Sequence, residues 1–234
     1  MKNPPIPALP TVQAPTLAIA NSTDRFPIRR VFCIGRNYPW PGSATPAGTP
    51  REAPFFFMKP ADTVVPAQGL IAYPPLSEDF CHEIELVVAI GKAGVNVPPE
   101  AALDHVWGYA AGLDLTRRDL QLEAKQAGRP WEGAKAFDAS APCSPLVPAH
   151  ISGHPTSGTV WLAVNGDQRQ HADLAELIWP VHELISFLSR SVTLQPGDLV
   201  FTGTPAGVAA LLPGDVIEAG IEGVAAFSVT IAPR

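Results

Sequence analysis

The chain has 234 residues and a formal net charge of −6, and its 16 Lys and Arg residues are scattered rather than gathered in a basic run. This length suits one large domain, or one domain with a small N-terminal extension, and the charge pattern argues against a nucleic-acid-binding surface. No apolar run approaches the ~20 residues that a membrane-spanning helix needs. Neither nucleic acid nor a membrane is therefore expected as a partner.

The cysteines and the first ten residues indicate the compartment. Cys33, Cys81 and Cys143 are odd in number and include no CxxC pair, a usage typical of reduced, intracellular proteins. The opening residues, MKNPPIPALP, lack the apolar segment of a secretory signal peptide. We therefore expect a soluble cytoplasmic protein.

The first ninety residues predict short strands separated by loops. Residues 1–15 are rich in proline and predict an extended arm. Residues 39–54 contain five prolines, which rule out a regular helix and favour a mobile loop. Strands are predicted at 16–20, 29–38, 55–59 and 84–92.

The rest of the chain predicts both helices and strands. A short helix entered through Pro98 and Pro99 leads into a strand that ends near Asp114, and residues 116–128 predict a helix that stops at Gly128. Further predictions are a hairpin (159–174), an amphipathic helix (181–194) and strands at 198–208, 214–223 and 224–232. Strands outnumber helices without βαβ alternation, so an α+β or mostly β domain is favoured over a doubly wound sheet.

Three acidic residues stand at the ends of apolar segments. Glu83 and Glu85 are two residues apart and share one face of the predicted strand, and Asp114 ends another strand. Two glutamates alone are most simply interpreted as a solvent-facing strand end. With the third acid, the set favours a hard cation such as Mg²⁺, Mn²⁺ or Ca²⁺, which binds carboxylate oxygens and would offset their repulsion.

Six segments in order resemble one known family. They are FPIRRVFCIGRNY (26–38), PFFFMKPADTVV (54–65), HEIELVVAIGK (82–92), GLDLTRRDLQ (112–121), GRPWEGAKAFDASAP (128–142) and FTGTPAGV (201–208). Together they resemble the fumarylacetoacetate hydrolase family over residues 26–232, and within it the bacterial fumarylpyruvate hydrolases of gentisate-type aromatic breakdown. The resemblance implies an N-terminal extension (1–25) and a catalytic domain (26–234). It also implies an α+β fold, a mixed β-roll with short helices, which assembles as a homodimer.

The resemblance also implies a set of site residues. The ligands of a Mg²⁺ or Mn²⁺ ion would be Glu83, Glu85 and Asp114, and Lys135 would be a catalytic residue facing the negative charge that develops on the substrate. The candidates for binding the 2-oxo acid substrate are Arg36, Arg118, Gln121, Lys135, Gly203, Thr204 and Pro205. Each has a purely structural alternative: Arg118 could pair with a glutamate on its own helix, Lys135 could be an ordinary surface lysine, and residues 203–205 could form a simple turn.

The sequence departs from the family after GRNY (35–38). Family hydrolases commonly carry there a short helix whose His and Glu activate water, but this chain has Pro41 and Ala44 at those positions. Glu52 is a candidate substitute base. His82 is a weaker one, because a regular strand would turn its side chain away from Glu83. A positioned general base typically contributes ~10²–10⁴ in rate.

Three functions follow from these residues. The first is metal-dependent hydrolysis of the C–C bond of an acylpyruvate, fumarylpyruvate giving fumarate and pyruvate. The second is decarboxylation of oxaloacetate or another 2-oxo diacid, which leaves the same enolate without an activated water. The third is a catalytically degenerate family member that binds a metal and a 2-oxo acid.

Overall fold

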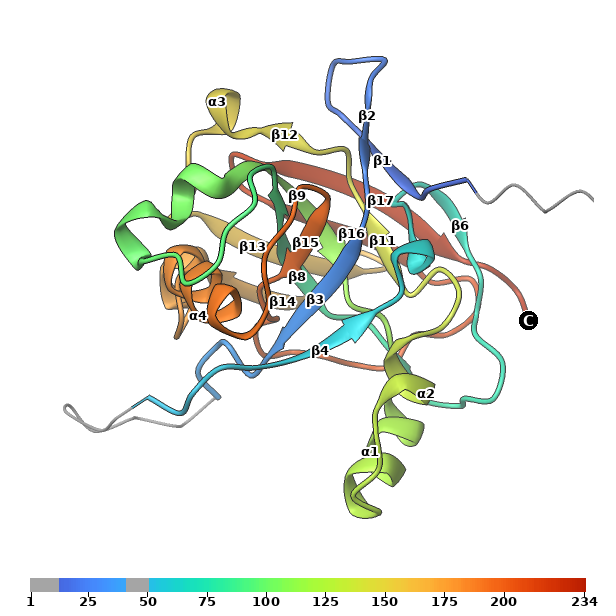
Figure 1. Ribbon diagram of the computed structural model, residues 1–234. Coiled ribbons are helices and arrows are strands. Elements are labelled where there is room, and N and C mark those ends of the chain that lie inside the picture. Colours follow the sequence, from blue (N-terminus) through green and yellow to red (C-terminus); the bar gives the residue numbers. More distant parts are fainter. Residues whose placement is uncertain (1–12, 41–50) are drawn as a thin grey trace, which may run out of the picture.

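Two mixed β-sheets packed face to face form the framework of the molecule (Figure 1). This computed structural model describes residues 13–40 and 51–234. Most of the predicted arm at 1–15, and positions 41–50 of the predicted mobile loop, lie outside these described residues.

The larger sheet has eight strands in the order β4-β3-β15-β8-β9-β11-β5, with β12 also paired to β9. Its strands are β3 (Arg30–Gly35), β4 (Phe55–Lys59), β5 (Val64–Pro66), β8 (Ile84–Ile90), β9 (Val106–Leu113), β11 (Ala141–Cys143), β12 (Val147–Pro148) and β15 (Asp198–Phe201). The smaller sheet has the order β14-β13-β16-β17-β6. Its strands are β6 (Gly69–Ile71), β13 (Thr159–Val164), β14 (Asp167–Asp173), β16 (Val216–Ile221) and β17 (Ala225–Ile231).

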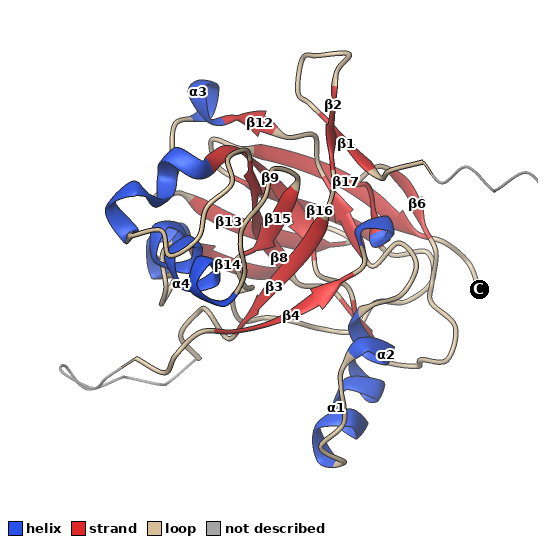
Figure 2. Cartoon of the chain, viewed as in Figure 1, coloured by secondary structure: helices blue, strands red, loops and turns tan. Residues whose placement is uncertain are grey.

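Two short strand pairs and a few helices complete the described chain. The strand pairs are β1 (Thr16–Ala18) with β2 (Arg25–Pro27), and β7 (Phe80–Cys81) with β10 (Thr116–Arg117). The helices are α1 (Arg118–Gln126), α2 (Glu132–Lys135), α3 (Ala149–Ser152), α4 (Val181–Ser191), and the 3₁₀ turns η1 (Ala61–Thr63), η2 (Pro99–His105) and η3 (Leu174–Glu176). Figure 2 shows the strands in the interior and the helices around them. None of the helices in the described part of the chain has the length and apolar character needed to cross a bilayer.

Both sheets mix parallel and antiparallel pairing. β3 with β15, β5 with β11, and β6 with β17 are parallel, whereas the other ladders of the two sheets are antiparallel. The hairpin between β13 and β14 turns at Asn165 and Gly166, whose φ values of 53° and 84° are those of a primed turn. The predicted α+β fold with a mixed β-roll is therefore confirmed.

Two predicted elements differ from the structure. The helix predicted from residue 116 begins at Arg118, because Thr116 and Arg117 pair as β10 with Cys81 and Phe80. The helix entered through Pro98 is a 3₁₀ turn rather than an α-helix. The predicted boundary at residue 25, between an N-terminal extension and a catalytic domain, stays a prediction. Strand β1 lies before this boundary, and its Leu17 is buried.

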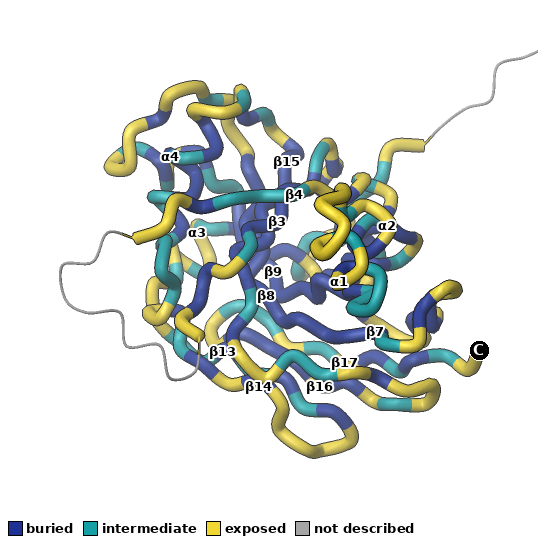
Figure 3. Tube along the Cα trace, turned by 90° about the horizontal axis from the view of Figure 1, so that it is seen from below, coloured by how far each residue is buried: buried dark blue, intermediate teal, exposed yellow. Residues whose placement is uncertain are grey.

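Strand β8 runs through the centre of the molecule and is buried along its whole length (Figure 3). Side chains at its even positions, such as Leu86 and Val88, pack into the core between the two sheets. Those of Val87 and Ala89 pack into a second core on the other face, which the β1–β2 hairpin covers. Glu85 is an odd position, so it points to the side of this second core.

Candidate active site

The strand register brings three acidic residues together. In the antiparallel ladder of β8 and β9, Glu85 lies opposite Gly112 and Ile84 opposite Leu113. One step further, the N–H of Asp114 donates to the carbonyl of Glu83 at 2.8 Å. Asp114 therefore stands across from Glu83 and on the same face as Glu85.

The three carboxylates form a buried cluster. Oxygen atoms of Glu83, Glu85 and Asp114 lie within 4.8 Å of one another, and all three residues are buried. Like charges this close repel, and their burial adds a desolvation cost. The cluster therefore needs positive charge, as expected from the sequence.

Lys135 supplies part of that charge. Helix α2 places its Nζ 3.0 Å from Oε2 of Glu83 and 2.8 Å from Oδ2 of Asp114. Only 2% of its side chain is exposed, so the alternative of an ordinary surface lysine is wrong. Thr116 donates a further hydrogen bond to Oε1 of Glu83 at 3.0 Å.

Lys59 is a second buried lysine at the cluster, and it was not among the predicted site residues. It ends β4, and its Nζ lies 2.9 Å from Oδ1 of Asp114. Its Nζ also donates to the carbonyls of Leu115 and Lys135. The available signal was a lysine that directly follows the apolar strand of residues 55–58, a position where burial requires a charged partner.

The electrostatics differ among the members of the cluster. Burial and the charges of Asp114 and Glu83 raise the pKa of Glu85 well above its ordinary value. Burial would also raise the pKa of Asp114, but the ammonium groups of Lys135 and Lys59 outweigh it and lower that pKa. Burial opposes the charge of Lys135, yet Asp114 and Glu83 raise its pKa. Three carboxylates thus face two ammonium groups, and Glu85 has the least compensation.

The turn at residues 203–205 contacts the cluster directly. The N–H of Gly203 donates to Oε2 of Glu85 at 2.7 Å, and the Thr204 hydroxyl donates to the carbonyl of Ile84 at 2.8 Å. Gly203 has a φ of +98°, and a Cβ there would lie 2.7 Å from Cβ of Asn37. Glycine is therefore required at this close approach.

Gln170 of β14 holds the same turn from the other sheet. Its amide nitrogen donates to the Thr204 hydroxyl at 2.8 Å and to the Pro205 carbonyl at 2.9 Å. Its oxygen accepts from the N–H of Ile84 and lies 2.9 Å from Nδ1 of His82. His82 is thus buried on the face away from Glu83, as its place in the sequence predicts. The turn also passes close to β14 at Gly207, where a Cβ would lie 1.9 Å from the carbonyl oxygen of Arg169.

Helix α1 carries two of the predicted substrate-binding residues. Nη1 of Arg118 donates to Oε1 of Gln121 at 3.0 Å, and Gln121 is buried. Arg118 therefore bonds to an amide on its own helix rather than to a glutamate. Lys125, one turn further along, donates to the same oxygen at 3.3 Å.

Arg36 and Glu52 lie on exposed segments. Arg36 has a φ of 55°, and Glu52 is anchored through its backbone, because the Trp179 indole N–H donates to the Glu52 carbonyl at 3.0 Å. Among the contacts of the described residues, none joins the Glu52 carboxylate to the cluster. Pro41 and Ala44, which replace the family His and Glu, lie outside the described residues.

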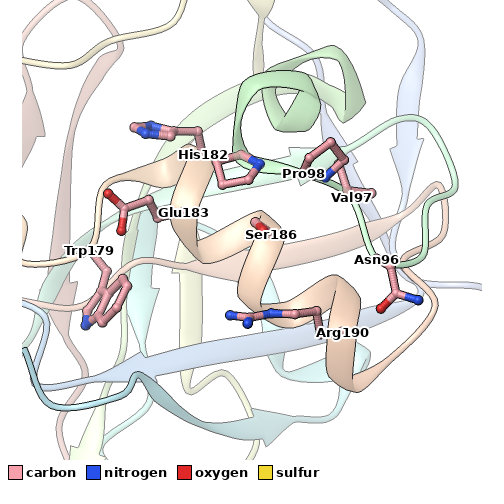
Figure 4. A pocket seen from close by; sticks show the side chains of 9 residues that line it. Asn96, Val97, Pro98, Trp179, His182, Glu183, Ser186 and Arg190 are labelled. Atoms are coloured by element: carbon pink, nitrogen blue, oxygen red, sulfur yellow. The ribbon is translucent and has the colours of Figure 1, made fainter.

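Two cavities lie near this region of the fold. One of about 250 Å³ is bordered by Lys135 and by the aromatic rings of Phe55, Phe57 and Trp131. The other, of about 440 Å³, lies between α4 and the segment before η2 (Figure 4). Lys135 lines the first cavity, whereas neither the three carboxylates nor Lys135 line the second, so the first of the two borders the candidate site.

Fold and site together define the class of the protein. The sequence profile described as "Fumarylacetoacetate (FAA) hydrolase C-terminal" matches residues 30–232. The chain belongs to the fumarylacetoacetate hydrolase family and is an enzyme, as the sequence predicts.

Individual relatives indicate which activities occur among proteins similar to this chain. The chain is 45% identical over 183 residues to the fumarylpyruvate hydrolase of Ralstonia sp, covering 78% of this chain and 94% of the relative. It is 40% identical over 196 residues to the mitochondrial oxaloacetate tautomerase of Rattus norvegicus, covering 84% and 88%. The crystal structure of fumarylpyruvate hydrolase from Pseudomonas aeruginosa in complex with Mn²⁺ and pyruvate superposes with a TM-score of 0.91 at 49% identity, covering 97% of this chain and all of that one.

The donor set of this chain fits a divalent metal ion. Three buried carboxylates converge within 4.8 Å, and they outnumber the two lysine ammonium groups beside them. Oδ1 of Asp114 is also buried without a hydrogen bond, since its ion pair with Lys59 lies outside hydrogen-bonding angles. Oxygen ligands of this kind suit a hard cation.

Proposed function

We propose that the protein is a metal-dependent hydrolase that cleaves the C–C bond of an acylpyruvate, with fumarylpyruvate giving fumarate and pyruvate in aromatic catabolism. The observation that carries this proposal is the buried carboxylate cluster with Lys135 bound to two of its members. Similarity to fumarylpyruvate hydrolases supports the choice of acyl group.

In this proposal Glu83, Glu85 and Asp114 hold a Mg²⁺ or Mn²⁺ ion. When bound, such an ion supplies Lewis-acid polarisation of the 2-oxo group of the substrate. Lys135 stays charged beside the same site, so its ammonium group faces the negative charge that develops on the pyruvate fragment. Lys59 keeps Asp114 ionised and oriented through the contact between Nζ and Oδ1.

The remaining predicted residues bind the substrate. We assign oxygen atoms of the substrate to Arg36, Arg118 and Gln121, and the carboxylate of its 2-oxo end to the turn at residues 203–205. The hydrogen bonds of this turn to Glu85, Ile84 and Gln170 support the assignment, because they fix it beside the cluster before substrate arrives.

The reaction consumes one water. Its oxygen bonds to the acyl carbonyl carbon, and the bond from that carbon to the pyruvate CH₂ breaks. The electron pair stays with pyruvate as an enolate, which takes up a proton to give the methyl group, while the new carboxylic acid loses one. Glu52 is the proposed acceptor of the water proton, since it lies on the segment that follows the replaced His and Glu positions.

Oxaloacetate is the second candidate substrate. Similarity to oxaloacetate tautomerases and the presence of Pro41 and Ala44 in place of the water-activating pair both favour it. Tautomerisation passes through the enolate of oxaloacetate itself. The decarboxylation expected from the sequence releases CO₂ and leaves the enolate of pyruvate, which then takes up a proton. Neither reaction needs an activated water.

The test is to incubate the purified protein with Mn²⁺ or Mg²⁺ and each substrate. Loss of fumarylpyruvate absorbance with equal release of fumarate and pyruvate supports hydrolysis. Enol–keto conversion or CO₂ release from oxaloacetate, without fumarylpyruvate turnover, supports the second candidate. Silence with both substrates would contradict both and leave a 2-oxo-acid-binding protein.

Assembly and location belong to the same proposal. A homodimer and a cytoplasmic location are proposed from the family resemblance and from the three free, buried cysteines. We also keep the division into an extension (1–25) and a catalytic domain (26–234) as a proposal.

A further inference from the structure

Two cations on α1 share one neutral oxygen. Arg118 and Lys125 donate to Oε1 of the buried Gln121, at 3.0 and 3.3 Å. Within the described chain, neither cation forms an ion pair with a carboxylate. An amide oxygen carries no charge to balance them, so two cationic groups, one from the start and one from the last turn of α1, meet at Gln121 without a carboxylate partner.

Aromatic rings connect this positive charge to the carboxylate cluster. Nζ of Lys125 lies 4.8 Å from the centre of the Trp131 ring, and that ring lies 5.8 Å from the ring of Phe57. Nζ of Lys135 lies 5.1 Å from the same Phe57 ring. Phe57, Trp131 and Lys135 also border the cavity of about 250 Å³. A flat, unsaturated chain that starts at the cluster would therefore meet aromatic faces on the way to Lys125.

The surroundings of Lys125 oppose its charge. Lys125 is an exposed residue, but partial burial and then the positive charges of Arg118, Arg36 and Lys135 lower its pKa, against the opposing charge of Glu83. Binding of an anion would relieve this repulsion. The site thus has an acidic end at the cluster and a basic end on α1, which is complementary to a ligand with two carboxylates, one held at each end.

We infer that Lys125 is a specificity-determining residue that binds the distal carboxylate of a dicarboxylic 2-oxo acid, with Arg118 beside it. This inference rests on the proposed function, because it places the 2-oxo end of the substrate at the cluster. It adds to that function a selection between acyl groups that carry a terminal carboxylate and those that do not.

The binding test uses Mn²⁺-loaded protein and calorimetry with matched 2-oxo acids. The pairs are 2-oxoglutarate with 2-oxopentanoate and 2-oxoadipate with 2-oxohexanoate, which differ only in the terminal carboxylate. One charge-assisted hydrogen bond predicts that the wild type binds a diacid at least ~10-fold more tightly than its partner. Lys125→Gln should abolish the preference, and Lys125→Glu should reverse it. Lys92→Gln, at an exposed lysine elsewhere, is the matched control and should keep it.

The turnover test compares kcat/KM for fumarylpyruvate and for acetylpyruvate, whose acyl group is uncharged. Lys125→Gln should lower the ratio of the two values ~10-fold, whereas Lys92→Gln should not change it. No preference in the wild type, or one that Lys125→Gln retains, would overturn the inference even if hydrolysis is normal. The two proposals can also fail separately. If the protein shows no hydrolase activity but prefers diacids, and Lys125→Gln abolishes that preference, the role of Lys125 is supported and the proposed hydrolysis is refuted.

Discussion

Glu85 differs from the other two acids of the cluster in what surrounds it. Glu83 and Asp114 each lie within 3.0 Å of a lysine Nζ, whereas the described partner of Glu85 is the N–H of Gly203. Burial and the charges of Asp114 and Glu83 raise its pKa and outweigh the opposing effects of the Gly203 N–H and of the charge of Lys135. Of the three candidate ligands, Glu85 is therefore expected to contribute least to the stability of the metal-free protein.

Replacing Glu85 by glutamine separates these two properties. Glu85→Gln keeps an acceptor for the Gly203 N–H but removes a charged ligand, so Mn²⁺ affinity should fall at least ~10-fold. The melting temperature of the metal-free protein should stay the same or rise, because an uncompensated buried charge is gone. Calorimetry and thermal unfolding measure both, with Glu132→Gln on the exposed face of α2 as the control. Unchanged Mn²⁺ affinity would refute the ligand assignment.

Lys59 has the opposite role. Lys59→Met fills similar space but leaves Asp114 with one lysine fewer, and it removes a donor from the carbonyls of Leu115 and Lys135, of which the second keeps the Ser140 hydroxyl. Removing one partner of a buried ion pair typically costs about 3–5 kcal/mol, and we expect a loss of this size in urea unfolding without metal. Lys92→Met, at an exposed lysine, should change stability by less than about 0.5 kcal/mol. Equal stabilities for the two variants would exclude a structural role for Lys59.

The sequence predicted part of this site. The common face of Glu83 and Glu85 follows from spacing alone, because alternation along a strand is local. Asp114 was a candidate because it ends another apolar segment, and the family resemblance implied the set of three. The candidate role of Lys135 came from the family resemblance, whereas its burial was found in the structure. Lys59 was missed because its burial depends on contacts with Leu115 and Lys135, which are far away in the sequence.

At the level of elements, β14 and the turn after β15 hold each other across the two sheets. Gln170 is the link, since it bonds to Thr204, Pro205 and Ile84. Gln170 contacts no carboxylate of the cluster in the described structure. We therefore expect it to affect ligand binding indirectly, by holding the turn in position.

Loss of this link should weaken the binding of pyruvate more than the binding of Mn²⁺. In Gln170→Leu the turn loses two donors, and we expect pyruvate affinity of the Mn²⁺-loaded protein to fall ~10-fold, with a cost of about 1–3 kcal/mol in stability for the unpaired buried groups. Mn²⁺ affinity should change far less, and KM should rise more than kcat falls. Gln168→Leu, exposed on the same strand, controls for the substitution. Equal losses of pyruvate and Mn²⁺ affinity would indicate a general disruption instead.

Most elements of the fold were predictable because their signals are local. The strand at 55–59 and the hairpin at Asn165–Gly166 occur as predicted. The start of α1 was misplaced by two residues, because Thr116 is held by a ladder to Cys81 that the local sequence does not reveal. The order of strands also joins distant segments, such as β3 beside β15, and was not predicted.

At the level of the whole molecule, the cluster gathers parts from across the larger sheet and beyond. The three carboxylates lie at the ends of β8 and β9, and the groups that contact them come from β4, α2 and the turn after β15. A ligand that binds only this folded arrangement stabilises the molecule as a unit.

Metal should therefore raise the unfolding temperature. At a Mn²⁺ concentration of 100 Kd the gain is about 2.7 kcal/mol, and excess EDTA should reverse it. Thermal unfolding with and without Mn²⁺ tests this, and Glu85→Gln should show a much smaller shift at the same concentration. A wild-type unfolding temperature that does not respond to Mn²⁺ would argue against the metal site.

The close approach at Gly207 limits which parts of the enzyme can be mutated without disturbing the fold. Any side chain there would collide with the Arg169 carbonyl and lift the 203–208 turn from β14. Helix α1, by contrast, projects from the sheets and exposes much of its surface (Figure 1). Libraries designed to change which acyl group is accepted should therefore diversify residues 122–129 and leave the glycine turn untouched.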